Sequence, residues 1–168
     1  PLSAFELVLA KFLVAYLPYG ALSGGLICLF EAARLVRTAL DAHLGLAGAL
    51  ALVDVPSLLY AWFVSLVVGA GVVAVSLAVG AARPNLNWDS PHEMMTPDVG
   101  CLSILFYGAY AAVTLFALLL PGAIGGFPML DHRWALWLAG LTIGLGTTAF
   151  VVAGSLWLAA WEVPRIDG

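Results

Sequence analysis

The sequence predicts an all-α polytopic membrane helix bundle, with about four transmembrane helices and an interfacial amphipathic helix. Two observations support this fold class. Hydrophobic residues make up 63% of the 168-residue chain and charged residues only 10%, whereas a soluble domain is roughly half apolar and a quarter charged. The sixteen charged residues also leave four long charge-free windows, which are Phe12–Phe30, Val55–Ala82, Val99–Leu130 and Trp134–Trp161. Each window approaches or exceeds the roughly 18 to 20 residues that a helix needs to cross hydrocarbon.

Each charge-free window predicts one transmembrane helix in a single transmembrane domain over residues 1–168. The windows lack the short alternating pattern that is typical of outer-membrane barrels. We expect the third helix to end before Pro121, because proline and the following glycine disfavour a helix interior. The four expected helices are about Leu7–Phe30, Ser57–Ala81, Val99–Leu120 and Trp134–Trp161.

The segment of residues 31–43 has an amphipathic pattern. Glu31, Arg34, Arg37 and Asp41 recur at helical spacing, so that Glu31 can pair with Arg34 and Arg37 with Asp41. This pattern predicts a separate helix that lies in the membrane interface. Such a helix could act as a gate or a lipid-contact element, or it could be a solvated connector.

The loop of residues 82–98 is the most polar part of the chain. Ser90, Pro91 and Glu93 form the pattern of a capping box, which predicts a short helix near Pro91–Met95. His92, Glu93, Asp89 and Asp98 lack a recognised metal-ligand spacing, and we interpret them as part of a solvated loop. The same interpretation applies to residues 131–133, so no metal site is expected.

The positions of the charges also exclude several function classes. No charged residue or histidine lies within the four windows, whereas buried charges usually mark ion or proton paths through a membrane. Haem ligation and proton pumping within the spans are therefore not expected. A net charge of −4 with six Lys plus Arg argues against nucleic-acid binding. The sequence shows no catalytic set and no cofactor motif, so we expect neither a catalytic site nor a bound cofactor.

Small residues recur at a spacing that suits helix packing. Gly20 and Gly24 form one GxxxG pattern, and Gly140 and Gly144 form another. In lipid, such glycines allow two helix backbones to approach closely. We therefore expect these four glycines at helix–helix contacts.

Two segments together resemble the permease subunits of ABC-2 type exporters. The first is the opening, Pro1–Phe12, which reads PLSAFELVLAKF. It is similar to a family segment of the form P-(L/V/I)-S-x-x-E-(L/I)-(L/V)-x-(A/G)-K. The second is Gly80–Pro91, which reads GAARPNLNWDSP. It is similar to a family loop of the form G-a-x-(F/Y)-P-x-(F/L)-x-W/x-(E/D)-(N/D)-P.

The resemblance implies a topology and a set of contact residues. The chain would correspond to the last four of about six transmembrane helices in a half-transporter. Both matching segments would be cytoplasmic and would contact the ATP-binding subunit. Residues 31–54 and 121–133 would then be extracytoplasmic, an orientation that the evenly distributed Lys and Arg do not decide. The implied contacts with the ATPase are Leu2, Ser3, Glu6, Asn85, Trp88, Asp89 and Pro91.

The resemblance further implies how the chain would work. An ATP-binding cassette subunit would drive alternating access, with a second permease half or a second copy of the chain, in a bacterial cytoplasmic (inner) membrane. Lys11 is the only lysine and no P-loop motif surrounds it, so the chain would not be an enzyme by itself. The first two family helices are absent, and Arg83 stands where the family often has an aromatic residue. We therefore expect a truncated or split permease.

Two other functions remain open at this stage. Four helices without buried charge also suit a non-catalytic anchor or accessory subunit of a larger membrane complex. A lipid-modifying enzyme would use His92–Glu93 or Asp131–His132 at the interface, although these groups do not converge in sequence. A bound ATPase partner would distinguish the exporter from the anchor.

Overall fold

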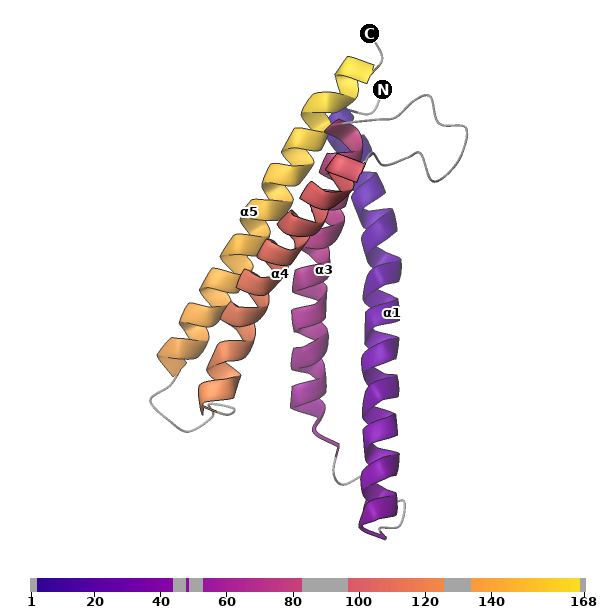
Figure 1. The fold of residues 1–168 in the computed structure, drawn as a ribbon, viewed down its shortest axis with the longest axis vertical. Helices are drawn as coiled ribbons and strands as arrows, with labels where there is room; N and C mark the ends of the chain where they lie inside the picture. Colours follow the sequence, from indigo (N-terminus) through magenta and orange to yellow (C-terminus); the bar gives the residue numbers. More distant parts are fainter. Residues whose placement is uncertain (1–2, 44–47, 49–52, 83–96, 126–133, 167–168) are drawn as a thin grey trace. The chain divides into compact units, whose positions relative to one another are not determined.

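The structure is a computed structural model that describes residues 3–43, 48, 53–82, 97–125 and 134–166. Over these residues it contains four long helices (Figure 1): α1 (Ala4–Asp41), α3 (Val55–Ala82), α4 (Pro97–Gly125) and α5 (Trp134–Ile166). All four are long and apolar enough to cross a membrane. The predicted all-α, multi-pass membrane fold is therefore confirmed.

The chain divides into two compact units. Unit 1 comprises Pro1–Tyr16 and Val67–Gly168, and unit 2 comprises Leu17–Leu66. The single transmembrane domain over residues 1–168 stays a prediction, because the packing defines these two units separately.

Polar and apolar side chains are distributed as expected for helices in lipid. The buried side chains of unit 1 include Ser103 and Thr148, whereas Phe116 and Phe150 are 66% and 80% exposed. In water this exposure would cost free energy through the hydrophobic effect. Hydrocarbon removes that cost, and it favours polar groups that bond inside the protein.

Helix α1 extends well beyond its charge-free stretch, Phe12–Phe30. Its 38 residues give a length of about 57 Å, against a hydrocarbon thickness of about 30 Å. Residues on both sides of Phe12–Phe30 therefore lie outside the membrane-spanning part of the helix. Glu6 stands before that stretch, and Glu31 and Arg34 stand after it.

The prediction of a separate interfacial helix over residues 31–43 is wrong in one respect. These residues are helical, but they continue α1 without a break to Asp41. The segment contains no Gly or Pro, and its Ala, Leu and Arg residues favour uninterrupted helix. The two expected ion pairs, Glu31–Arg34 and Arg37–Asp41, are confirmed. His43 then adopts a positive φ of 51°, as residues beyond a helix C-terminus often do.

A capping box fixes the start of α1. The Ser3 backbone N–H donates to Glu6 Oε2 over 2.7 Å, and the Glu6 backbone N–H donates to Ser3 Oγ over 3.3 Å. These reciprocal bonds satisfy two N–H groups that a helix end otherwise leaves without partners. Ser3 and Glu6 therefore have a structural role in this chain.

This capping box predicts a pH dependence at the start of α1. The hydrogen bond from the Ser3 N–H, together with that from the Ser3 side chain, lowers the pKa of Glu6. A lowered pKa means that the stabilisation is present above the pKa of the unfolded carboxyl, about 4.3, and is lost as the pH falls through the folded value. The protection factors of the first-turn amides, which correct for the slower intrinsic hydrogen exchange at lower pH, should therefore fall on acidification.

Two variants separate the parts of the capping box. Glu6→Gln retains a box-forming side chain and should remove the pH dependence. Ser3→Ala removes the cap and should cost about 1 kcal/mol in local helix stability at neutral pH. An unchanged pH profile in Glu6→Gln would contradict this assignment.

Helix α4 continues past the point where the sequence predicts its end. The expected end at Leu120 is wrong, because the helix includes Pro121 and extends to Gly125. Proline has no N–H to bond the carbonyl of Ala117, four residues earlier. Gly140 of α5 approaches that carbonyl so closely that a Cβ at position 140 would collide with the Ala117 oxygen. Packing against a neighbouring helix is one way in which membrane proteins tolerate proline within a span.

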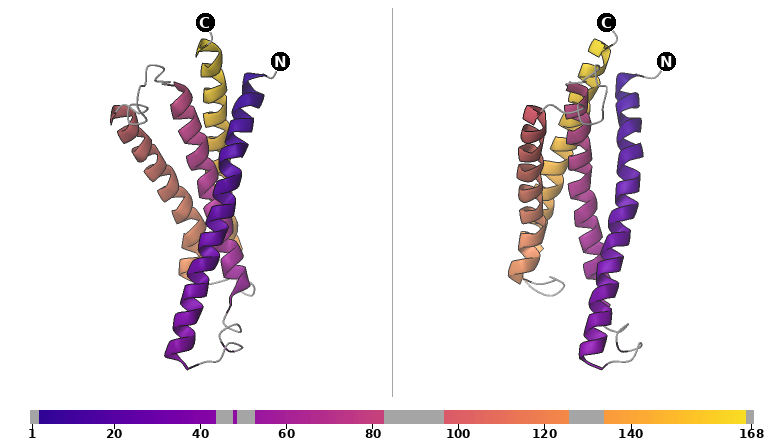
Figure 2. Two further views of the ribbon diagram at one scale, coloured as in Figure 1. Left: turned by 90° about the vertical axis from the view of Figure 1, so that its right-hand side faces the viewer. Right: turned by 45° about the vertical axis from the view of Figure 1, so that its right-hand side comes forward.

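The core of unit 1 joins three helices. Val8 and Phe12 of α1 pack with Ala74 of α3 and with Leu156 and Ala159 of α5. Helices α4 and α5 contact one another, and they lie side by side in the right-hand view of Figure 2.

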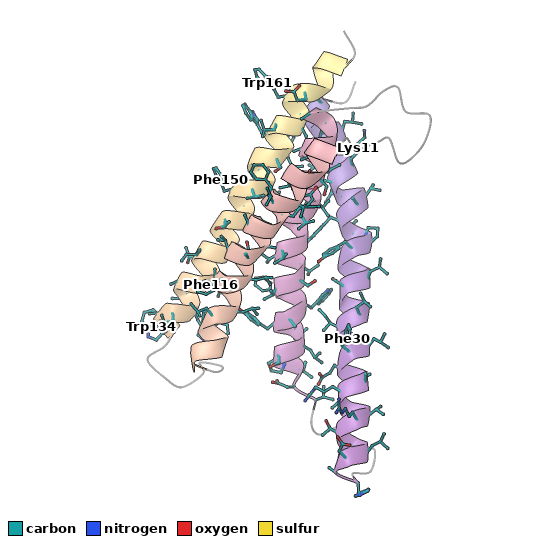
Figure 3. The ribbon with its side chains drawn as sticks, in the orientation of Figure 1. Lys11, Phe30, Phe116, Trp134, Phe150 and Trp161 are labelled. Atoms are coloured by element: carbon teal, nitrogen blue, oxygen red, sulfur yellow. The ribbon has the colours of Figure 1, made fainter. Side chains whose placement is uncertain are left out.

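Aromatic residues stand at the two ends of α5. Trp134 and Trp161 lie at opposite ends of this helix (Figure 3) and are 64% and 56% exposed. Their separation along the helix is about 40 Å. Such a spacing suits the aromatic belts at the two membrane interfaces.

Candidate functional site

The start of α1 and the end of α3 come together at one end of unit 1. Val8 and Phe12, near the start of α1, belong to the same cluster as Ala74 of α3. Leu77 and Ala81, near the end of α3, also pack against this cluster. The pairing arises because the two helices run in opposite directions. It brings Ser3 and Glu6 to the end of the unit at which α3 terminates.

The described residues include only part of the expected ATPase contact. Ser3 and Glu6 are exposed at the start of α1. Their hydrogen bonds to one another are those of the capping box. Lys11 is exposed one to two turns later, where its side chain can extend toward lipid headgroups. The other expected contacts lie outside the described residues: Leu2, Asn85, Trp88, Asp89 and Pro91.

Gly140 and Gly144 lie in the contact between α4 and α5. A Cβ on Gly140 would collide with the Ala117 carbonyl oxygen and would stand 2.8 Å from Pro121 Cγ. A Cβ on Gly144 would stand 2.7 Å from two atoms of Leu118, which is fully buried. Both positions therefore require glycine for this close approach.

Gly20 and Gly24 accommodate a side chain in unit 2. The indole of Trp62 lies against Gly24, where a Cβ would stand 3.0 Å from Nε1. Trp62 Nε1 donates to the Gly20 carbonyl over 3.1 Å. This second GxxxG pattern thus provides space for a tryptophan ring and for a hydrogen bond that crosses between α1 and α3.

Unit 1 contains a buried, hydrogen-bonded polar cluster around Tyr110. The Tyr110 hydroxyl donates to the Val67 carbonyl over 2.9 Å and lies 2.8 Å from Thr148 Oγ1. A Cβ on Gly71 would collide with the Tyr110 ring, so this glycine provides the space for it. Tyr110 is 6% exposed and Thr148 8%. The cluster joins α3, α4 and α5.

The contribution of Thr148 to the free energy of unfolding can be measured. Thr148→Val keeps the side-chain shape and removes the interhelical partner of Tyr110, so it should cost about 1 kcal/mol in the free energy of unfolding. Thr142→Val is the matched control, because Thr142 Oγ1 donates within its own helix, to Leu138, over 2.7 Å. Unfolding in mixed micelles compares the two variants. Equal losses would contradict an interhelical role for Thr148.

The described residues contain no cluster of three or more His, Cys, Asp or Glu side chains that could hold a metal ion. The residues His92, Glu93, Asp89 and Asp98, like residues 131–133, fall outside the described ranges. In comparisons with known proteins, no family model, no curated protein and no solved structure matches this chain.

Proposed function

We propose that this chain is the transmembrane permease subunit, or part of it, of an ATP-driven exporter of the ABC-2 type. The observation that carries the proposal is the pairing of α1 and α3 in unit 1. Through Val8, Phe12 and Ala74, this pairing joins the start of α1 to the end of α3. The two segments that resemble the exporter family, Pro1–Phe12 and Gly80–Pro91, adjoin these same helix ends.

In this proposal the two family-like segments form the surface through which the ATP-binding subunit drives transport. Such a surface requires both segments on one side of the membrane. An ATP-binding cassette subunit can push on two loops together only if both loops face it. In this proposal, that end of unit 1 faces the cytoplasm of a bacterium, and the chain resides in the inner membrane. A second permease half or a second copy completes the transport path. ATP hydrolysis takes place in the partner.

A second candidate function is that of a non-catalytic anchor or accessory subunit of a larger membrane complex. The capping box favours it, because the box gives Ser3 and Glu6 a purely structural role. The four charge-free windows also favour it, because they carry no charged residue or histidine for a transport path. The two candidates differ in the partner that each requires.

The partner can be identified by purifying the tagged chain from native membranes in mild detergent. Mass spectrometry should find a stoichiometric partner with a P-loop motif, and the complex should hydrolyse ATP. Glu6→Gln preserves the capping box and removes the charge, so it should lower ATPase activity only if Glu6 contacts the partner. Asp41→Asn, at the opposite end of α1 and 75% exposed in its side chain, is the matched control.

Recovery of redox or photosynthetic subunits without ATPase activity would refute the exporter proposal. It would make the chain a structural member of that complex. Equal ATPase activity in Glu6→Gln, Asp41→Asn and the unmodified complex would restrict Glu6 to its capping role.

A further inference from the structure

Unit 2 contains a pocket of about 590 Å³ where the second half of α1 faces the start of α3. Ile27, Phe30 and Leu58 form its apolar wall, and Glu31, Arg34 and Asp54 supply its charged groups. The charged groups lie beyond Phe30, the last residue of the charge-free stretch of α1. The pocket is therefore apolar on its membrane side and charged at the membrane interface.

The charged groups of this pocket interact with one another. Arg34 Nε donates to Glu31 Oε2 over 2.7 Å, and Arg34 Nη2 donates to Glu31 Oε1. The Arg34 side chain is nevertheless 55% exposed, and its Nη1 edge remains for a further acceptor. The hydrogen bond from Arg34 lowers the pKa of Glu31, while the nearby charge of Asp54 opposes this effect. One guanidinium and two carboxylates give the pocket a net charge of about −1 at neutral pH.

Asp54 combines two roles at the start of α3. Its Oδ1 accepts the Ser57 N–H over 3.4 Å, and its Oδ2 accepts the Ser57 hydroxyl. It thereby caps the first turn of α3. Asp54 is exposed, and each carboxylate oxygen has two lone pairs. It can therefore accept a further hydrogen bond while it caps the helix.

An apolar groove of about 320 Å³ adjoins the charged pocket. It shares Ile27 and Phe30 with the pocket and continues along α1 past Leu26 and Leu22 to Tyr19. Leu22 and Leu26 are 68% and 55% exposed. From Tyr19 to Phe30, α1 rises by about 16 Å, which is close to half of the hydrocarbon thickness of about 30 Å. The groove thus has the length of one lipid leaflet.

We propose that this pocket and groove bind one zwitterionic phospholipid with a primary amine headgroup, a phosphatidylethanolamine. Arg34 binds the phosphate, Asp54 and Glu31 accept hydrogen bonds from the ammonium group, and the groove between Tyr19 and Phe30 holds an acyl chain. The net negative charge disfavours an anionic lipid. A quaternary choline has no N–H to donate, so it forms none of the charge-assisted hydrogen bonds available to an amine. This inference does not depend on the exporter proposal.

Native mass spectrometry of the purified full-length chain tests the site. Three lipids with identical acyl chains are titrated separately: phosphatidylethanolamine, phosphatidylcholine and phosphatidylglycerol. The first should bind about tenfold more tightly than the other two, as expected for charge-assisted hydrogen bonds at a partly exposed site. Asp54→Asn and Arg34→Gln should each weaken its binding by about five- to tenfold.

Matched controls exist on the same helix outside the pocket. Asp41→Asn and Arg37→Gln remove the same kinds of charge from a pair whose side chains are 75% and 87% exposed. Both should bind the lipid as the unmodified chain does. Asparagine caps a helix about as well as aspartate, so Asp54→Asn should retain its helix content by circular dichroism.

Three outcomes would overturn the proposal. The first is equal affinity of the unmodified chain for the ethanolamine and choline lipids, which requires no variant to fold. The second is tighter binding of the glycerol lipid, which would indicate an anion site. The third is an equal loss of binding in Asp41→Asn and Arg37→Gln, which would indicate a general charge effect.

Discussion

Replacing Gly140 with alanine is expected to destabilise the packing of α4 against α5 by about 2 to 3 kcal/mol, a typical cost of overpacking a close contact. The new methyl group would collide with the Ala117 carbonyl oxygen and would stand 2.8 Å from Pro121 Cγ. The collision with Ala117 involves a backbone atom, which a change of rotamer cannot move away. The two helices must therefore separate along this contact.

Reversible unfolding in mixed detergent micelles measures this loss. Gly146→Ala and Gly154→Ala, on the same helix, are matched controls because no atom lies within 4 Å of an added Cβ at either position. They should be neutral or slightly stabilising, because alanine is the better helix former by about 1 kcal/mol. If Gly140→Ala behaves like these controls, α4 and α5 do not pack as described.

Replacing Gly71 with alanine is expected to cost about 3 kcal/mol in the free energy of unfolding, from overpacking and from the loss of buried hydrogen bonds. The added Cβ would overlap the ring and hydroxyl of Tyr110. The ring would have to move, which would break its bonds to the Val67 carbonyl and to Thr148.

A double-mutant cycle tests the cause of that loss. Gly71→Ala should be far less costly when Tyr110 is already alanine, because the colliding ring is then absent. Gly80→Ala is the control on the same helix, since its added Cβ would have no neighbour within 4 Å. Additive effects of the changes at Gly71 and Tyr110 would show that the two residues do not touch.

The sequence predicted the helices well because the membrane imposes a simple rule. A charge-free window of sufficient length must satisfy its backbone hydrogen bonds within itself, and a helix does so. The predicted ion pairs Glu31–Arg34 and Arg37–Asp41 depend only on helical spacing and are likewise confirmed. These features are local, so a single sequence contains the information for them.

Two helix boundaries were predicted wrongly from the sequence. Pro121 predicted the end of a helix, but α4 continues where Gly140 of α5 packs against the Ala117 carbonyl. The residues after Phe30 predicted a separate helix, whereas no residue there interrupts α1. At Pro121 the missing information is the packing of α5. After Phe30 the residues themselves, without Gly or Pro, favour the continuous helix.

The candidate site likewise combines local features, which the sequence contains, with contacts that depend on the packing of helices. Ser3 and Glu6 were assigned to a partner contact by resemblance, although their spacing is also that of a capping box. The contact between Gly71 and Tyr110 joins residues distant in sequence, and Gly71 belongs to neither GxxxG pattern. Asp54 was not among the predicted site residues, but it caps α3 and lines a charged pocket. Only the packing of helices reveals the contact between Gly71 and Tyr110 and the pocket beside Asp54.

Photocrosslinking in native membranes tests the central claim, that the start of α1 and the end of α3 together face an ATP-binding subunit. A photoreactive amino acid replaces Phe5, which is 49% exposed, or Gly80, whose added Cβ would meet no atom within 4 Å. Val36, 60% exposed near the other end of α1, is the control position. We expect positions 5 and 80 to crosslink to the same protein with a P-loop motif, and position 36 not to do so. Crosslinks from positions 5 and 80 only to lipid, or to a protein without that motif, would contradict the account.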